Sequence, residues 1–414
     1  MTQFLIGFDR IDITPKVPLP LYGMGNDYVR KENFVFPKCE ADKLLANTVV
    51  LSSGSSESTV VLCVLDTLFI HEFFSVPIAK AIGEVLDIPG ENVILTATHT
   101  HSGVSMIKPD EDVKCYNEWL KDELVKSAKR AADDLSNASV LGGSADTRGM
   151  NFQRRFILKD GSHRCTVADR TFNAADIASY ESEADNTLRA VRFVREGKKD
   201  IVIANWQAHP GFTASFTVGR VSADFIGDFR LFGEEDGSAN FVYIQGAAGN
   251  LEVRTRFKSD PYYEWNSTLD RAGYAKELAR ILNEDIAFSK MNVGDIRIQS
   301  EKLEVRQKVG KDILDEKHAL PLTAVTFGDI AICTAPNELY SDSGLELRRR
   351  SPFKATLLCT NANGCYGYLP IKVCFDNETY NTNENGDSFG VRVSKCEAGT
   401  AEKVTDTLAK MLEK

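Results

Sequence analysis

The chain has 414 residues, of which 43% are hydrophobic and 26% charged, the profile of a globular protein with enough residues for a large core or two lobes. Its formal net charge of −10 argues against nucleic-acid partners and against anionic membrane surfaces, because both attract basic faces. No apolar run approaches the roughly 20 residues that span a bilayer.

The N-terminus and the cysteines indicate the cellular compartment in which we expect the protein. No basic stretch precedes the first apolar residues, and Asp9 and Arg10 interrupt them, so no signal peptide is predicted. The nine cysteines are scattered without a CxxC pair; Cys63 and Cys333 fall in apolar runs, where cysteine acts as a small hydrophobe. We therefore expect a reduced, cytoplasmic protein without a disulfide framework.

Strand-like and helix-like segments alternate along the chain. In chain order, we expect strands at 47–53, 59–66 and 92–97, a helix at 112–135, strands at 201–207 and 241–245, a helix at 268–283, a hairpin of 322–327 and 330–334, a strand at 354–360 and a helix at 400–413. This alternation predicts a mixed, layered α/β fold. The polar stretches 104–112, 210–222 and 254–267 are expected to be active-site loops.

A pair of histidines follows the third expected strand. The chain has six histidines, and His99 and His101 both lie in the segment Thr96–Gly103, just after the apolar run 93–95. Residues two apart in an extended chain point to the same side, so both imidazoles should enter one space. This pattern is compatible with a metal or catalytic site. Taken alone, however, such a pair is more often part of a solvated loop.

Three more segments carry polar or aromatic side chains just beyond a strand. His209 follows 201–207, Glu338 follows 330–334, and Tyr366 and Tyr368 follow 354–360. In α/β sheets the carboxyl ends of strands line the ligand crevice. Two imidazoles and a carboxylate form the ligand set of a catalytic zinc with an open position. The same residue types could also form a buried polar cluster, and the pattern alone leaves both interpretations open.

Several motifs in order resemble those of the neutral (non-lysosomal) ceramidase family, nearly from end to end. They are Gly7–Pro15 with Asp12-Ile13-Thr14-Pro15, Thr98–Gly103, Ala208–Pro210, Ser222–Gly227, Glu338 of a Pro-x-Glu block, Gly367-Tyr368, Tyr380, and Glu397-Ala398-Gly399 with Glu402. The resemblance implies a single catalytic domain over residues 1–414, with its site at the carboxyl ends of strands.

The resemblance also implies a zinc amidase with assigned residues. It implies that the zinc ligands are His99, His209, Glu338 and Tyr368. His101 and Tyr380 would contact the substrate or the developing oxyanion. Either Arg154 or Arg155 would lie near the family's active-site arginine; the alternative is that these two form a surface pair.

The chain departs from the family pattern at one block of the site. In Ala248–Arg254, Glu252 stands where the family has a serine. Glu252 could be the general base or could form a salt bridge to Arg254 or Arg256. The chain also stops where the family's catalytic domain stops, before the immunoglobulin-like domain, and no secretion signal is visible.

Because of these departures, we expect a substrate other than ceramide. We expect a zinc-dependent hydrolase that cleaves an N-acyl (amide) bond of a small soluble molecule with a metal-activated water, rather than ceramide in a membrane. One alternative is a metal-dependent hydrolase of an ester or of a sugar or cyclitol. Another is a binding protein that kept the fold without activity, although retention of all four expected ligands argues against it.

Overall fold

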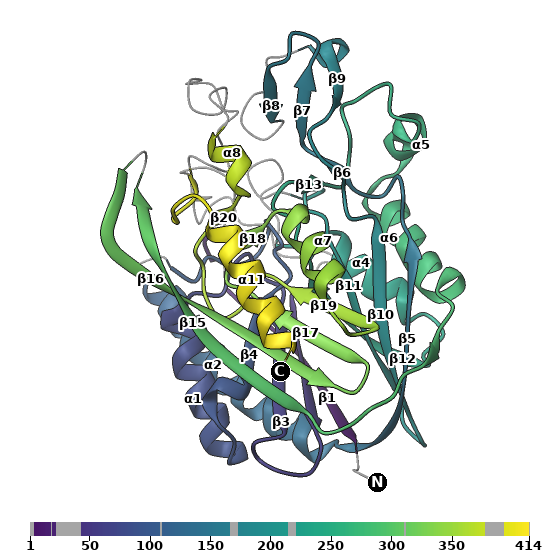
Figure 1. Cartoon of the computed structure of the whole chain (residues 1–414). Coiled ribbons are helices and arrows are strands. Elements are labelled where there is room, and N and C mark those ends of the chain that lie inside the picture. Colours follow the sequence, from purple (N-terminus) through teal and green to yellow (C-terminus); the bar gives the residue numbers. More distant parts are fainter. Residues whose placement is uncertain are drawn as a thin grey trace.

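The protein is described here from a computed structural model over residues 4–17, 19–21, 43–107, 110–165, 173–213, 221–309, 312–376 and 393–413. It is built of four layers, in which two β-sheets stack face to face and helices cover the outer face of each sheet (Figure 1).

The larger sheet supplies the middle of the molecule. Within the described ranges it has nine strands, in the order β12-β11-β10-β5-β1-β2-β3-β4, with β14 paired to β5. Their bounds are β1 Leu5–Asp12, β2 Leu45–Ser52, β3 Thr59–Leu65, β4 Val93–Ala97, β5 Ser136–Asp146, β10 Thr187–Arg195, β11 Asp200–Trp206, β12 Ala239–Gln245 and β14 Ser289–Lys290. The pairs β3–β4 and β11–β12 are parallel, so β3 and β4 end at one edge, as do β11 and β12.

The smaller sheet packs on one face of the larger one. Its order is β15 (Arg297–Val309), β16 (Asp312–Phe327), β17 (Ile330–Thr334) and β19 (Ala355–Cys359), and β17 and β19 run parallel. Residues of the two facing surfaces, among them Ile203 and Ile244 from one sheet and Phe327, Ile332 and Leu357 from the other, form one buried apolar cluster. This cluster fixes how the two sheets sit on each other.

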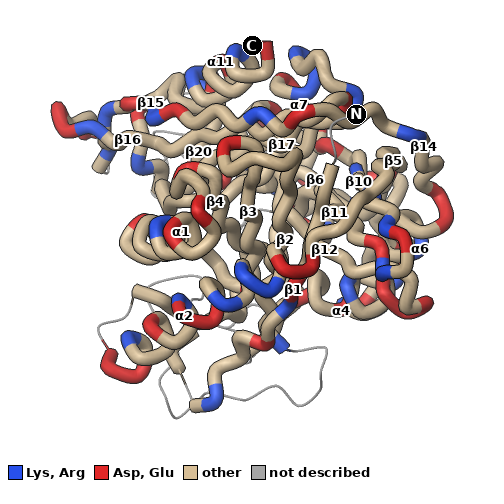
Figure 2. Tube along the Cα trace, turned by 90° about the horizontal axis from the view of Figure 1, so that it is seen from below, with Lys and Arg blue, Asp and Glu red and all other residues tan. Residues whose placement is uncertain are grey.

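Helices close both outer faces, and Figure 2 shows the layers edge-on. On the larger sheet, α1 (Glu72–Leu86) and α2 (Glu111–Asp133) pack beside β2–β4, whereas α4 (Asp224–Gly233) and α6 (Arg271–Arg280) pack beside β10–β12. The π-helical turn Ile281–Asp285 continues α6. On the smaller sheet, α7 (Ser341–Arg350) and α11 (Thr400–Glu413) cover the outer face.

Short elements gather at the carboxyl ends of the parallel strands. They are β6 (Phe152–Gln153), β13 (Leu251–Glu252), β18 (Glu338–Leu339), β20 (Tyr368–Leu369), a small sheet of β8 (His163–Cys165), β7 (Arg155–Leu158) and β9 (Ile177–Tyr180), and the helices α5 (Tyr263–Thr268) and α8 (Lys372–Asp376). β13 pairs with β6, and β18 pairs in parallel with β20. Figure 1 shows β13, β18 and β20 together at the upper end of both sheets.

The mixed, layered α/β expectation is confirmed, and each expected strand and helix has a counterpart in the structure. The expected hairpin turns at Gly328, whose φ of 64° suits glycine. The expectation of an irregular stretch over 254–267 is wrong at its end, where α5 forms. The helix expected at 268–283 begins later, at Arg271, because the Asp270 side chain caps it by accepting from the Gly273 N–H. None of the helices in the described ranges combines the length and hydrophobicity needed to cross a bilayer.

Phe327 lies at the interface of the two sheets, with ring centroids 5.3 Å from Phe4 and 6.4 Å from Phe193. Phe327→Ala should lower the free energy of unfolding by about 3–5 kcal/mol, because it leaves a cavity between sheets that cannot collapse. Leu231→Ala on α4, where the side chain is 54% exposed, is the control and should change it by only about 0.5 kcal/mol. Urea unfolding of both variants measures this, and equal losses would contradict the face-to-face packing.

Candidate metal centre

Side chains from both sheets meet at one place. His99 follows β4 and His209 follows β11 of the larger sheet, whereas Glu338 and Tyr368 begin β18 and β20, just beyond β17 and β19 of the smaller sheet. The parallel register of β18 and β20 sets Glu338 directly opposite Tyr368. All four side chains are buried. Stacking the two sheets therefore brings together residues that are far apart in the chain.

The polar atoms of these side chains converge closely. The Nε2 atoms of His99 and His209 are 3.1 Å apart. One carboxylate oxygen of Glu338, Oε2, lies 3.2 Å from the first and 3.1 Å from the second. The Tyr368 hydroxyl lies 3.1 Å from His209 Nε2.

The tautomers of the two histidines follow from their outer partners. Nδ1 of His99 lies 3.0 Å from the carbonyl oxygen of Leu68, and Nδ1 of His209 lies 2.7 Å from that of Ala248. A carbonyl only accepts hydrogen bonds, so each Nδ1 must carry a proton, and in the neutral imidazole each Nε2 then presents a lone pair. The same arrangement orients metal-binding histidines in proteins.

When both imidazoles are neutral, three acceptors face one another, and the donor in reach is the Tyr368 hydroxyl, 3.1 Å from His209 Nε2. The two Nε2 lone pairs and the Glu338 oxygen repel, and their burial denies them water. A cation among them removes this conflict. A tetrahedral zinc with bonds of about 2.0–2.1 Å places its ligand atoms roughly 3.3 Å apart, and the observed 3.1–3.2 Å separations fit that size.

The protonation states suit a metal as well. Burial, followed by the Arg154 charge, lowers the pKa of His209 to about 4. Burial alone would raise the pKa of Glu338, but His99 and His209 hold it well below the usual range. Burial raises the pKa of Tyr368 well above its ordinary value. A neutral His209 beside an ionised Glu338 matches the protonation states that metal binding requires.

His101 stands at the rim of this cluster. Its ring centroid lies 5.0 Å from that of His99 and 5.7 Å from that of His209. Within the described ranges neither of its buried ring nitrogens has a hydrogen-bond partner, and burial lowers its pKa well below the ordinary value. The three histidines together offer ligand atoms within 4.8 Å of one another. That spacing is wider than one tetrahedral centre needs, whereas Glu338 is already close enough to serve as the third ligand.

The two adjacent arginines point to different places, and neither is a surface residue as the alternative interpretation had it. Arg154 and Arg155 are 4% and 2% exposed. The Arg154 guanidinium lies 5.1 Å from the Tyr368 ring centre and donates to the carbonyl of Gly249. Arg155 instead pairs with Glu181 and donates to the Tyr340 hydroxyl at 3.3 Å. Arg154 is therefore the arginine beside the convergent polar atoms.

Glu252 is connected to the cluster by a backbone contact with His209. It ends β13, opposite Phe152 of β6, and forms an isolated parallel bridge with His209. It is partly buried. Burial lowers the pKa of Arg154, but electrostatic attraction to Tyr368 and, more weakly, to Glu252 holds that pKa above the ordinary value. Tyr380, the other residue expected to contact substrate, lies outside the described residues.

The backbone around the cluster is tightly constrained. His99 has a φ of 68°, a left-handed conformation that costs a residue with a Cβ about 1–2 kcal/mol. A Cβ on Gly249 would come within 2.5 Å of the Glu338 carbonyl oxygen. The contacts of the two outer carbonyls and the close approach at Gly249 are not apparent from the sequence, although Ala248 and Gly249 belong to the block that carries Glu252.

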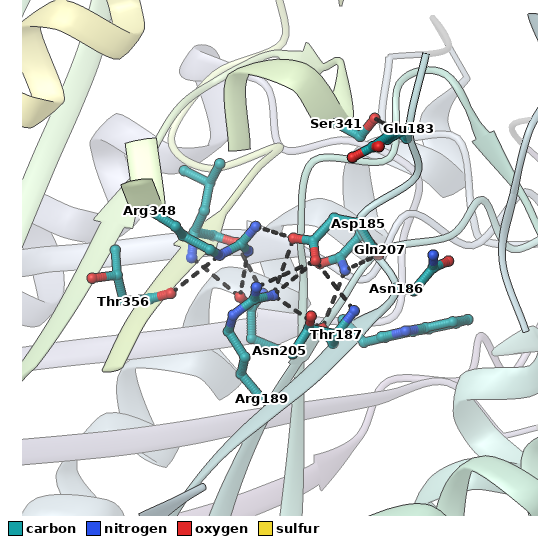
Figure 3. A network of polar contacts seen from close by, with 12 residues as sticks. Glu183, Asp185, Asn186, Thr187, Arg189, Asn205, Gln207, Ser341, Arg348 and Thr356 are labelled. Atoms are coloured by element: carbon teal, nitrogen blue, oxygen red, sulfur yellow. Dashed lines mark hydrogen bonds and ion pairs between the residues drawn. The ribbon is translucent and has the colours of Figure 1, made fainter. Parts of the chain in front are cut away.

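A buried polar network that is not apparent from the sequence joins the two sheets (Figure 3). The Asp185 carboxylate accepts from Arg189 at 3.0 Å and from Arg348 of α7. Arg348 and the Leu358 N–H also donate to Asn205 Oδ1, each at 3.2 Å. Burial would raise the pKa of Asp185, but the two guanidinium groups lower it. The network links α7 and β19 of one sheet to the segment before His209 in the other.

His209 makes the stability of the metal-free protein depend on pH. Between its folded pKa of about 4 and its ordinary value of 6.5, only the unfolded chain takes up the proton, so stability should fall as pH falls across this window. The loss should reach about 3 kcal/mol. Urea unfolding with a chelator, for wild type and His209→Gln, measures it. The variant should show a shallower dependence, and identical profiles would contradict the buried, neutral state of His209.

Comparison with known proteins places the fold. No protein-family model matches the chain, and no curated protein matches its sequence. Among solved structures, the neutral ceramidase from Pseudomonas aeruginosa matches with a TM-score of 0.71 and 16% identity, over 100% of this chain and 74% of that one. A ceramidase complexed with C2 matches with a TM-score of 0.70 and 15% identity, over 100% and 75%. The chain therefore has the fold of the neutral ceramidases.

Proposed function

We propose that this protein is a zinc-dependent hydrolase that cleaves the amide bond of a small, soluble N-acyl substrate. The observation that carries the proposal is the convergence of two imidazole lone pairs and one carboxylate oxygen within 3.2 Å. The shared fold supports it, because the similar solved structures are ceramidases by name.

His99, His209 and Glu338 would hold the metal, with the Tyr368 hydroxyl beside them. When bound, zinc would polarise the scissile carbonyl and lower the pKa of a water to about 7. The side chains do the remaining work. The carbonyls of Leu68 and Ala248 keep both histidines in the metal-binding tautomer.

Arg154 and His101 would act on the substrate. A buried guanidinium beside Tyr368 is a fixed positive charge in a water-poor place, where it stabilises a developing oxyanion strongly. His101 adds a neutral imidazole whose nitrogens can bond a substrate group. Tyr380 would complete this set, on the basis of the family resemblance.

Glu252 would replace the family's serine in a different role. An ionised carboxylate accepts hydrogen bonds only, so it cannot donate one as a serine does. It can take the proton of the attacking water. Arg254, one candidate for a competing ion pair, donates to the Leu269 carbonyl, and its guanidinium lies 5.1 Å from the Phe212 ring centre.

The metal assignment predicts one zinc per chain. His99→Ala and His209→Ala should each lose most of it, because each removes a nitrogen ligand from a site with few alternatives. His163→Ala is the control, since His163 pairs with Glu181 away from the cluster. Elemental analysis of purified protein measures the zinc, and full zinc in both ligand variants would refute the assignment.

The substrate class is tested with a panel of short-chain N-acyl amides, esters, glycosides and long-chain ceramide in micelles. We expect the highest kcat/KM on a short-chain amide, abolished by a chelator and restored by zinc. Ceramide turnover as fast as that of the best short-chain amide would contradict the proposed soluble substrate. Preference for an ester or a glycoside would identify a different bond.

Glu252→Gln separates the possible roles of this residue. As general base, its loss should lower kcat by about 10²–10⁴-fold while zinc and fold remain. A matched control is Glu181→Gln, which removes the carboxylate partner of the neighbouring Arg155 and should cost stability while leaving the rate within a few-fold. An unchanged rate with full zinc in Glu252→Gln would eliminate the base, and lost zinc would make Glu252 a ligand.

A further inference from the structure

Residues 65–68, at the end of β3 and just beyond it, hold His99 in its left-handed backbone conformation. The Thr98 N–H donates to the Leu65 carbonyl and the His99 N–H to the Thr67 carbonyl, both at 2.9 Å. The His99 ring donates from Nδ1 to the Leu68 carbonyl. Both the backbone and the ring of His99 are thus held by residues 65–68, so any movement of that segment moves the imidazole.

A buried carboxylate lies inside this segment. Asp66, with a fully buried side chain, uses both oxygens twice. Oδ1 accepts from the Thr98 hydroxyl at 3.1 Å and from Arg230 Nη1 at 3.2 Å. Oδ2 accepts from Arg230 Nη2 at 2.6 Å and from the Leu45 N–H at 2.8 Å. Each oxygen of the Asp66 carboxylate therefore accepts two hydrogen bonds, and together they fix the position of the side chain.

Arg230 brings α4 into this arrangement. Its side chain is 4% exposed and spans from the helix to Asp66. Ser222, just before α4, binds the chain on the other side of His99. The Thr100 hydroxyl donates to the Ser222 carbonyl at 2.7 Å, and the Ser222 N–H donates to the Ser102 carbonyl at 3.1 Å. The histidine-bearing loop is therefore fastened to α4 on both sides of His99.

We infer that Asp66 and Arg230 are a positioning pair that holds Thr98 and His99 in the conformation needed to bind the metal. This inference deepens the proposed function and rests on it. Neither residue contacts the convergent polar atoms, so the pair acts through Thr98 and not on substrate. A buried ion pair is seldom the most stabilising choice for a core, whereas its directional bonds fix geometry. Here those bonds fix residues 65–68, the segment whose carbonyls hold His99 in place.

The test measures metal binding without substrate. Asp66→Asn keeps the shape but removes the charge and turns one acceptor into a donor that faces an N–H of Arg230, since both Asp66 oxygens accept from Arg230. Arg230→Lys keeps the charge but loses the two-pronged contact. Zinc affinity is measured by competition with a chromophoric chelator, and the visible spectrum of the Co²⁺-loaded protein reports ligand geometry. We expect each variant to bind zinc about 10–100-fold more weakly, the usual effect of losing an outer partner, with an altered cobalt spectrum.

Asp134→Asn is the matched control. Asp134 also pairs with an arginine, Arg195, at 2.5 Å and accepts from a backbone N–H, that of Phe8, at 3.0 Å, and it pairs with Lys198 as well. Its charged partners lie at the turn between β10 and β11, whereas Asp66 follows the carboxyl end of β3. Asp134→Asn should lower the melting temperature while leaving zinc affinity and the cobalt spectrum unchanged. Equal zinc affinity in wild type, Asp66→Asn and Arg230→Lys would overturn the inference.

Thr98→Val and Thr98→Ser keep the test decisive if the charge variants fail to fold. Valine removes only the hydroxyl that reaches Asp66, and serine restores it. Valine should weaken zinc binding and serine should recover most of it; equal affinities would overturn the inference. Wild-type protein that binds no zinc would refute the proposed function itself, whereas a wild type that binds zinc alongside indifferent variants would refute only the positioning role.

Discussion

The arrangement of the site depends on one electrostatic conflict. Two imidazole nitrogens and a carboxylate oxygen converge at one buried point, while the other ring nitrogen of each histidine bonds to the carbonyl of Leu68 or Ala248. Leaving buried acceptors without a donor costs several kcal/mol. A metal ion among these atoms would balance their charge, and the surrounding backbone contacts hold the two imidazoles in place.

The layered fold is what makes this cluster possible. One half comes from the larger sheet and the other from the smaller, so neither sheet holds a complete site. The apolar interface around Phe327 and Ile203 sets the separation of the sheets, and the Asp185–Arg348 contact pins them together near the cluster. Because β18 and β20 are short and, within the part of the chain that the structure describes, pair only with each other, they present Glu338 and Tyr368 without extending the main sheets.

The sequence was most informative where hydrophobic runs end in unusual polar residues. Strong apolar strands such as β4 and β11 were predictable, and so was the position of His99 and His209 just beyond them. β5 was missed because its glycines and small polar residues lack a clear hydrophobic period, and α1 because Pro77 interrupts its pattern. The choice between Arg154 and Arg155 depended on how β6 and β7 turn, which no local pattern encodes. The catalytic roles of His101, Glu252 and Tyr380 stay predictions. The contribution of Asp66 was invisible, since its partners Thr98 and Arg230 come from distant parts of the chain.

Dividing the proposed metal ligands between two sheets would have a thermodynamic consequence. A ligand that binds only the folded state stabilises it by RT ln(1 + [L]/Kd), about 2.7 kcal/mol when free metal exceeds Kd a hundredfold. Here that stabilisation would act across the sheet–sheet interface, as a cross-link between layers rather than within one. The supply of zinc in the cell would then help to set how much of the chain is folded and escapes degradation, so that metal limitation would reduce the amount of protein as well as its activity.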